Sequence, residues 1–268
     1  MEQKKILYIA QEITPYLDET PMGSFARLLP QIVQEAGDDV RVFMPKYGTI
    51  NERRHQLHEV IRLSGMNLVI NDVDMPLIVK VASIQKERMQ VYFIDNDEYF
   101  KQEDAFDDQG KLYADNDERC IFFAKGIIET VKKLNWSPDL IHIQGWLGAL
   151  LPLYLQTYCK EEPIFQHTKV ITCFLREPFT GSLDEGILEK IAFDEITPDQ
   201  APELKEPNSM NLIKLASRYS DGVTTLRGTL PQEAISYITS LGKPFLCEEN
   251  IETTCKSYPQ FYKEVMGK

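Results

Sequence analysis

Polar and aromatic side chains follow two of the apolar runs that the sequence predicts to be buried strands. Asp95, Asn96 and Tyr99 come after one run, and His142 and Trp146 lie at the end of another. Carboxylates, carboxamides and aromatic rings suit the hydroxyl groups and apolar faces of a sugar ring. Ligands of open α/β sheets bind at the carboxyl ends of strands. These five residues are therefore the candidates for substrate binding.

Each candidate also has a purely structural explanation. A histidine beside a buried strand is more often a hydrogen-bonded core residue than a ligand-binding one, and this favours a core position for His142. Trp146 is similarly expected to pack under the helix that follows it. Asp95 and Asn96 are typical of residues that cap a turn.

The other side chains that could bind a metal or take part in catalysis do not indicate a further functional site. His55 and His58 are three residues apart and could share a helix face, but no third metal ligand has a suitable spacing. Cys173 is predicted to be buried and inert, since no neighbouring base is identified. Arg176 and Glu177 could face a cleft, although a surface ion pair is the more common arrangement.

The composition excludes several classes of protein. The chain has 268 residues, of which 29 are basic and 41 acidic, so its net charge is −12. Nucleic acid is not an expected partner, because its binding depends on Lys and Arg that neutralise phosphates. There is no apolar run of about 18 residues that would span a membrane, and no secretory signal pattern. With five scattered cysteines, we expect a cytoplasmic protein with reduced thiols and without a cofactor.

Strand and helix patterns alternate along the chain, which predicts an α/β fold with a doubly wound, mostly parallel, Rossmann-like sheet. Short apolar runs typical of strands covered on both faces occur at 6–10, 40–44, 139–143, 170–174 and 222–226. Helical spacing of apolar residues occurs at 23–35, 119–134, 147–158 and 211–219. The absence of a linker-like stretch favours one domain, 1–268.

Two of these helices have a predicted apolar face. In the helix at 23–35 the face consists of Phe25, Leu28, Leu29, Ile32 and Val33, and Pro30 is expected to kink or restart the helix. In the helix at 119–134 the face consists of Ile121, Ala124, Ile128 and Val131. The same spacing places Lys125 on the solvent side.

The remaining segments have weaker patterns. Residues 67–95 contain three apolar runs that predict hairpin-like strands, and the acidic stretch 103–118 is expected to be a solvated surface loop. The polar stretch 180–208 is expected either to cover the sheet or to cap a cleft.

The chain resembles the bacterial glycogen/starch synthases in segments spread along most of its length. The matching segments, in chain order, are KKILYIAQEITP (4–15), GDDVRVFMPKY (37–47), VYFIDNDEYF (91–100), WSPDLIH (136–142) and SDGVTT (220–225). Their order and spacing carry the resemblance.

The resemblance implies a glycosyltransferase of the two-domain GT-B type, with its active site between two Rossmann-like domains. Such enzymes transfer glucose from ADP-glucose to the end of an α-1,4-glucan without a metal. The first domain largely carries the glucan side, and the second carries most of the donor site. This chain is expected to correspond to the first domain and to lack the second.

The first loop departs from the pattern of the family it resembles. That family has Lys-Thr-Gly-Gly-Leu-Gly where residues 18–23 stand here. Asp18 takes the place of the lysine, Thr20 and Pro21 take the places of the paired glycines, and only Gly23 remains. A carboxylate repels phosphate and a proline lacks an amide donor, so we expect this loop to bind phosphate poorly.

Two further motifs are altered. The family's His-Asp-Trp motif keeps its tryptophan as Trp146, but Gln144 and Gly145 replace the histidine and aspartate. In the family's Thr-Ile-His-Asn segment, the histidine of the reaction centre aligns with Phe174, which cannot donate a hydrogen bond to a sugar hydroxyl.

These departures lead to one main hypothesis and two alternatives. The chain is interpreted as a synthase-like domain without independent transferase activity, a pseudoenzyme that binds an α-glucan or supports a protein partner in glycogen metabolism. One alternative is a half-enzyme completed by a second chain that carries the donor domain. The other is a scaffold protein without affinity for sugars.

Overall fold

The computed structural model describes residues 3–84, 88–101, 105–106 and 110–267. Within these residues the strands form one mixed sheet, in the order β10-β9-β8-β7-β1-β2-β6-β5-β3, with β4 paired to β5. The strands are β1 (Lys5–Ala10), β2 (Asp39–Pro45), β3 (His58–Glu59), β4 (Met66–Ile70), β5 (Val73–Ile84), β6 (Met89–Asp95), β7 (Leu140–Gln144), β8 (Lys169–Phe174), β9 (Gly222–Leu226) and β10 (Phe245–Glu248).

The sheet confirms the predicted α/β class and its mostly parallel character. All pairs from β10 to β6 are parallel, whereas β3, β4, β5 and β6 join by antiparallel pairs, as the hairpin-like runs predicted. Ile6 of β1 is in register with Val40 of β2 on one side and with Leu140 of β7 on the other. The chain therefore reverses its winding direction at the boundary between β1 and β7.

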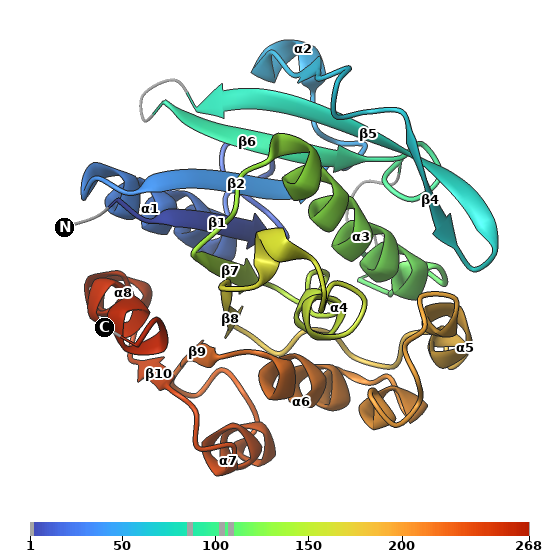
Figure 1. Cartoon of the computed structure of the whole chain (residues 1–268). Helices are drawn as coiled ribbons and strands as arrows, with labels where there is room; N and C mark the ends of the chain where they lie inside the picture. The colour runs from blue at the N-terminus through green and yellow to red at the C-terminus, as the bar shows by residue number, and fades with distance from the viewer. Residues whose placement is uncertain (1–2, 85–87, 102–104, 107–109, 268) are drawn as a thin grey trace.

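Helices cover both faces of the sheet (Figure 1). The helix α1 (Pro21–Glu35) packs against α8 (Ile251–Val265), and α4 (Leu151–Gln156) packs between α3 (Asn116–Leu134) and α6 (Ser209–Tyr219). The other helical elements are α2 (Glu52–His55), η1 (Pro163–Phe165), α5 (Ile187–Ala192), η2 (Pro202–Lys205) and α7 (Gln232–Ser240). No helix among the described residues has the length and apolar character needed to cross a membrane.

Helix α1 differs from the prediction in two respects. It begins at Pro21 and continues through the buried Pro30 to Glu35, so the helix does not restart at this proline. The predicted apolar face is only partly buried, because Leu28 is 38% exposed. Thr20 caps the first turn, and proline is tolerated at the position that follows a cap.

Helix α3 is buried on more sides than its apolar face predicts. The face itself is confirmed, but Lys125, expected on the solvent side, is 5% exposed. The helix also begins at Asn116, three residues earlier than expected, and Asp117 is fully buried instead of solvated. These side chains are covered because α4, α5 and β4 also pack against α3. The rest of the predicted acidic loop lies partly outside the described residues.

The C-terminal part contains elements that the sequence pattern did not predict. Helix α7, strand β10 and helix α8 follow β9, which had been expected to be the last strand. The polar stretch 180–208 contains α5 and η2, which pack against α3 and α6. The predicted helix at 147–158 is shorter, since α4 covers only Leu151–Gln156.

Candidate functional site

The carboxyl ends of β1 and β7 meet where the winding direction reverses, which is where open α/β sheets bind ligands. Here the position is filled by Gln11, whose Oε1 accepts hydrogen bonds from the amides of Trp146 (3.1 Å) and Leu147 (3.3 Å). Gly145 has φ +90°, and a Cβ on it would lie 2.8 Å from the Gln11 side chain. The glycine therefore permits both this turn and the close approach of Gln11.

Gln144 and Phe174 close the same region from the neighbouring strands. The Gln144 amide donates to the carbonyl of Met22 (2.7 Å) and thereby ties β7 to the first turn of α1. Phe174 at the end of β8 is 1% exposed. The hollow between Met22, Trp146 and Phe174 has a volume of only about 10 Å³, close to the minimum that one water molecule needs.

The N-terminus of α1 is also occupied by the chain's own groups. Thr20 Oγ1 accepts from the amide of Gly23 (2.8 Å) and donates to the carboxylate of Glu12, which is 7% exposed. Pro21 contributes no amide. A phosphate at this helix end would therefore compete with an internal cap and meet a carboxylate. Asp18, at the position of the family lysine, is exposed in the preceding loop.

We expect Thr20→Ala to lower the free energy of unfolding by about 0.5–2 kcal/mol, the usual effect of losing an N-cap. Urea unfolding of the variant and of Thr180→Ala, at an exposed threonine, measures this difference. Equal stability of both variants would contradict the capping role of Thr20.

A groove of about 610 Å³ lies beside this closed region, and it continues into a second hollow of about 500 Å³. Pro15, Tyr16, Arg54 and His55 line both parts. The rest of the groove is lined by Glu12, Thr14, Leu17, Asp18, Glu19, Thr20, Thr49 and Asn51. Hydroxyl, carboxylate and amide groups thus surround the rings of Tyr16 and His55, and this lining can hydrogen-bond a polyhydroxylated ligand.

The aromatic side of the groove is held by contacts with the core. The Tyr16 ring contacts His55 at 5.1 Å and Phe93 at 4.9 Å between ring centroids. Burial, and to a lesser degree the charge of Arg54, lowers the pKa of His55. His55 and His58 do not share a helix face, because α2 ends at His55 and His58 belongs to β3.

Asp95, Asn96 and Tyr99 lie together but are buried and engaged with the protein itself. Asp95 forms an ion pair with Lys80 (2.9 Å), although burial raises its pKa. Asn96 Oδ1 accepts from the amide of Tyr99 (3.1 Å), which is the turn-capping arrangement. The Tyr99 hydroxyl donates to Glu118 (2.8 Å). None of the three lines the groove.

His142 is also a core residue here. Its Nδ1 lies 2.8 Å from the hydroxyl of Tyr262, and its ring contacts Tyr8 and Tyr258 at 5.4 and 5.1 Å. Complete burial lowers the pKa of His142 to about 3. Two of these neighbours, Tyr258 and Tyr262, belong to α8, the helix that the sequence pattern did not predict.

Trp146 is buried, as the structural explanation expected, but its ring partners do not belong to the helix that follows it. It is 2% exposed and lies between Phe106 and Phe179, with ring centroids at 5.8 and 5.0 Å.

Cys173 is fully buried, which raises its pKa to about 11. The side chain of Arg176 is 58% exposed.

Arg176 does not form the expected pair with its neighbour in sequence. Its closest described carboxylate contact is Glu12, at 3.9 Å. Four residues of the closed region and the groove were not among the candidates from the sequence: Gln11, Glu12, Tyr16 and Arg54. The only signal for the first two was their place directly after the first apolar strand.

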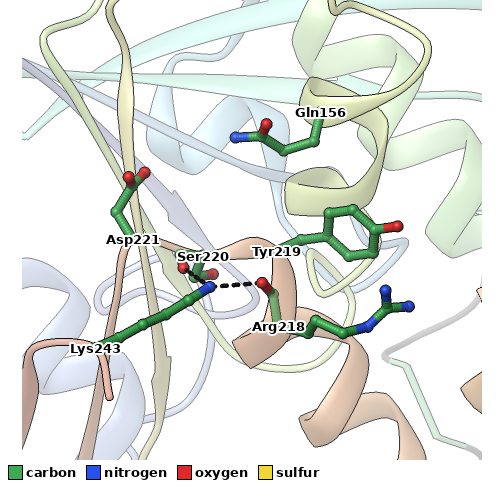
Figure 2. A pocket seen from close by; sticks show the side chains of 6 residues that line it. All are labelled: Gln156, Arg218, Tyr219, Ser220, Asp221 and Lys243. Carbon is green, nitrogen blue, oxygen red and sulfur yellow. Dashed lines mark hydrogen bonds between the residues drawn. The ribbon is translucent and has the colours of Figure 1, made fainter. Parts of the chain in front are cut away.

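A further hollow of about 300 Å³ lies at the opposite, amino-terminal edge of the sheet (Figure 2). Lys243 dominates it, and its ammonium donates to the carbonyls of Arg218 (2.5 Å) and Ser220 (2.6 Å) at the end of α6. Burial lowers the pKa of Lys243. This lysine caps the helix, so the hollow has a structural explanation.

Residues 5–242 match the family described as the starch synthase catalytic domain. Glycogen synthase of Chlorobium limicola is 32% identical over 82% of this chain and 45% of its own length, and that of Chlorobium chlorochromatii is 39% identical over 72% and 40%. The chain thus spans less than half the length of these relatives.

A solved structure, the catalytic domain of starch synthase IV from Arabidopsis thaliana bound to ADP and acarbose, has the same fold. The TM-score is 0.75 at 18% identity, over 93% of this chain and 52% of that one. On the family match and the glycogen synthase relatives, the chain belongs to the starch synthase catalytic domain family.

Proposed function

We propose that this synthase-like domain binds an α-glucan and does not by itself transfer glucose from ADP-glucose. The observation that carries the proposal is Gln11, which occupies the amides of Trp146 and Leu147 at the reversal point of the sheet. Thr20 and Glu12 occupy the helix end where a diphosphate would need free amides. The occupied amides and the Glu12 carboxylate disfavour binding of a negatively charged nucleotide sugar. They do not hinder binding of a neutral glucan.

The adjoining groove supports the glucan part of the proposal. Its volume of about 610 Å³ is within the range of about 300–1,000 Å³ typical of small-molecule sites. Acarbose, a sugar-like ligand, is bound by the Arabidopsis relative of the same fold. In this chain we assign the groove around Tyr16 and Arg54 to the glucan, and a supporting role beside a protein partner of glycogen metabolism is compatible with it.

We expect saturable binding of maltoheptaose and no binding of ADP-glucose in separate calorimetric titrations of the 268-residue chain. Arg54→Ala should weaken maltoheptaose binding about tenfold, because a hydrogen bond from a charged group contributes about 1.5 kcal/mol. Arg53→Ala is the matched control, since Arg53 is exposed on the same short helix but does not line the groove.

Three outcomes would count against parts of this proposal. Transfer of glucose from ADP-glucose to glycogen at a rate typical of enzymes would overturn the inactivity. If the two arginine variants bound maltoheptaose with equal affinity, the assignment of the groove to the glucan would be wrong. Binding of neither ligand would leave only the family relationship and the fold, and would favour a protein partner.

A further inference from the structure

Two exposed aromatic side chains flank a hollow at the ends of α4 and α5, two helices that do not contribute to the groove. Tyr158 is 43% exposed and Phe193 is 53% exposed. The hollow has a volume of about 350 Å³, and its other lining residues are Thr157, Asp194, Glu195 and Gln200. Aromatic rings offer an apolar face to a sugar ring, and the polar groups beside them can hydrogen-bond its hydroxyls.

A buried ion pair lies beside the Tyr158 ring. Lys125 pairs with Asp194, and the hydroxyl of Tyr154 donates to the second oxygen of that carboxylate (2.7 Å). The Lys125 ammonium lies 5.4 Å from the centre of the Tyr158 ring. Phe193 directly precedes Asp194 in the chain. The Tyr158 ring is therefore positioned before a ligand arrives, which reduces the entropy lost on binding.

The backbone conformation of Glu195, which lines the hollow, is unusual for a residue other than glycine. Glu195 has φ +61° and donates its amide to the carbonyl of Ala192 (3.0 Å) at the end of α5. Glycine is the common residue in this left-handed position, and a larger side chain there costs about 1 kcal/mol. Here the exposed Glu195 occupies this position and lines the hollow.

We propose that this hollow is a second carbohydrate site, separate from the groove, which binds glucose units of a neutral α-glucan. The rings of Tyr158 and Phe193 contact the apolar faces of the sugar, while Thr157, Glu195 and Gln200 meet its hydroxyls. A polyanion is disfavoured by the net charge of −12. The choice of an α-glucan among carbohydrates rests on the proposed function, whereas the site itself rests on the lining residues.

Retention by glycogen in native affinity electrophoresis tests this site. The double variant Tyr158→Ala/Phe193→Ala should bind glycogen at least about tenfold more weakly, since two aromatic contacts are lost. Tyr158→Phe keeps the ring and should retain the wild-type affinity. Tyr237→Ala is the matched control, because Tyr237 also lies near a lysine, at 5.8 Å from Lys214 Nζ, but lines neither site.

The outcomes separate this inference from the proposed function. Wild-type affinity of a folded double variant would overturn the second site, and the Arg54→Ala result would still stand for the groove. Glycogen binding that survives Arg54→Ala but is lost in the double variant supports the second site alone. A double variant that loses only self-association in sedimentation velocity would overturn the carbohydrate site, and would identify the surface as a contact between two copies.

Discussion

Replacing Lys125 with alanine is expected to lower the free energy of unfolding by about 3–5 kcal/mol, because it leaves the Asp194 carboxylate buried without its counter-charge. Asp194 is 7% exposed. Lys125 also donates to the carbonyl of Val69 on β4 (2.8 Å), so the variant loses a link between the helix and the hairpin. Urea unfolding followed by circular dichroism measures the change.

A control and a rescue make this experiment specific. Arg227 pairs with Glu249 at 3.0 Å, but the two side chains are 69% and 63% exposed, so Arg227→Ala should change stability by less than about 1 kcal/mol. Lys125→Met/Asp194→Leu removes both charges and should recover most of the loss. A Lys125→Ala variant as stable as Arg227→Ala would contradict the burial of this pair.

Lys125 also shows what periodicity can predict and what it cannot. A repeat of apolar residues identifies the face of α3 that meets the sheet, and that face was predicted correctly. It gives no information on which other elements pack against the helix, and here α4, α5 and β4 do so. A lysine with long methylene groups can then be buried, provided that a carboxylate distant in sequence meets it.

The parallel strands were predictable because each is covered on both faces and therefore forms a continuous apolar run. Strand β10 is only half-buried at all four of its residues, and it therefore does not need a long apolar run of this kind. Helix α8 carries a recognisable apolar face at Tyr258, Phe261, Tyr262 and Val265, which the sequence reasoning did not use. Pro259 interrupts the helical pattern there.

The sequence predicts only part of the arrangement at the carboxyl ends of β1 and β7, where Gln11 fills the usual ligand position. The sequence shows that Gln144, Gly145 and Phe174 depart from the family it resembles, but not what fills the space. That requires the contact between Gln11 and Trp146, which are 135 residues apart in the chain. The same limit applies to His142, whose partner Tyr262 is 120 residues away.

His142 should make the protein markedly less stable as the pH falls. Burial lowers its pKa to about 3, whereas in the unfolded chain the ring binds a proton near pH 6.5. Between these values the unfolded state holds more protons than the folded state, so stability rises with pH. We expect a loss of about 1.4 kcal/mol for each pH unit below 6.5.

Comparing His142→Asn with the wild type isolates this contribution from the acidic groups that titrate in the same range. The Tyr262 hydroxyl donates its own proton to Tyr8, so the amide N–H of asparagine can donate to it in place of Nδ1–H, but asparagine does not titrate. We expect the variant to be less stable than the wild type at pH 7.5. On going to pH 5, however, its free energy of unfolding should fall by about 2 kcal/mol less than that of the wild type. His167→Asn, at an exposed histidine, is the matched control for the substitution itself. An unchanged slope in His142→Asn would mean that the ring titrates in contact with water, and His142 would then return as a candidate for binding the glucan.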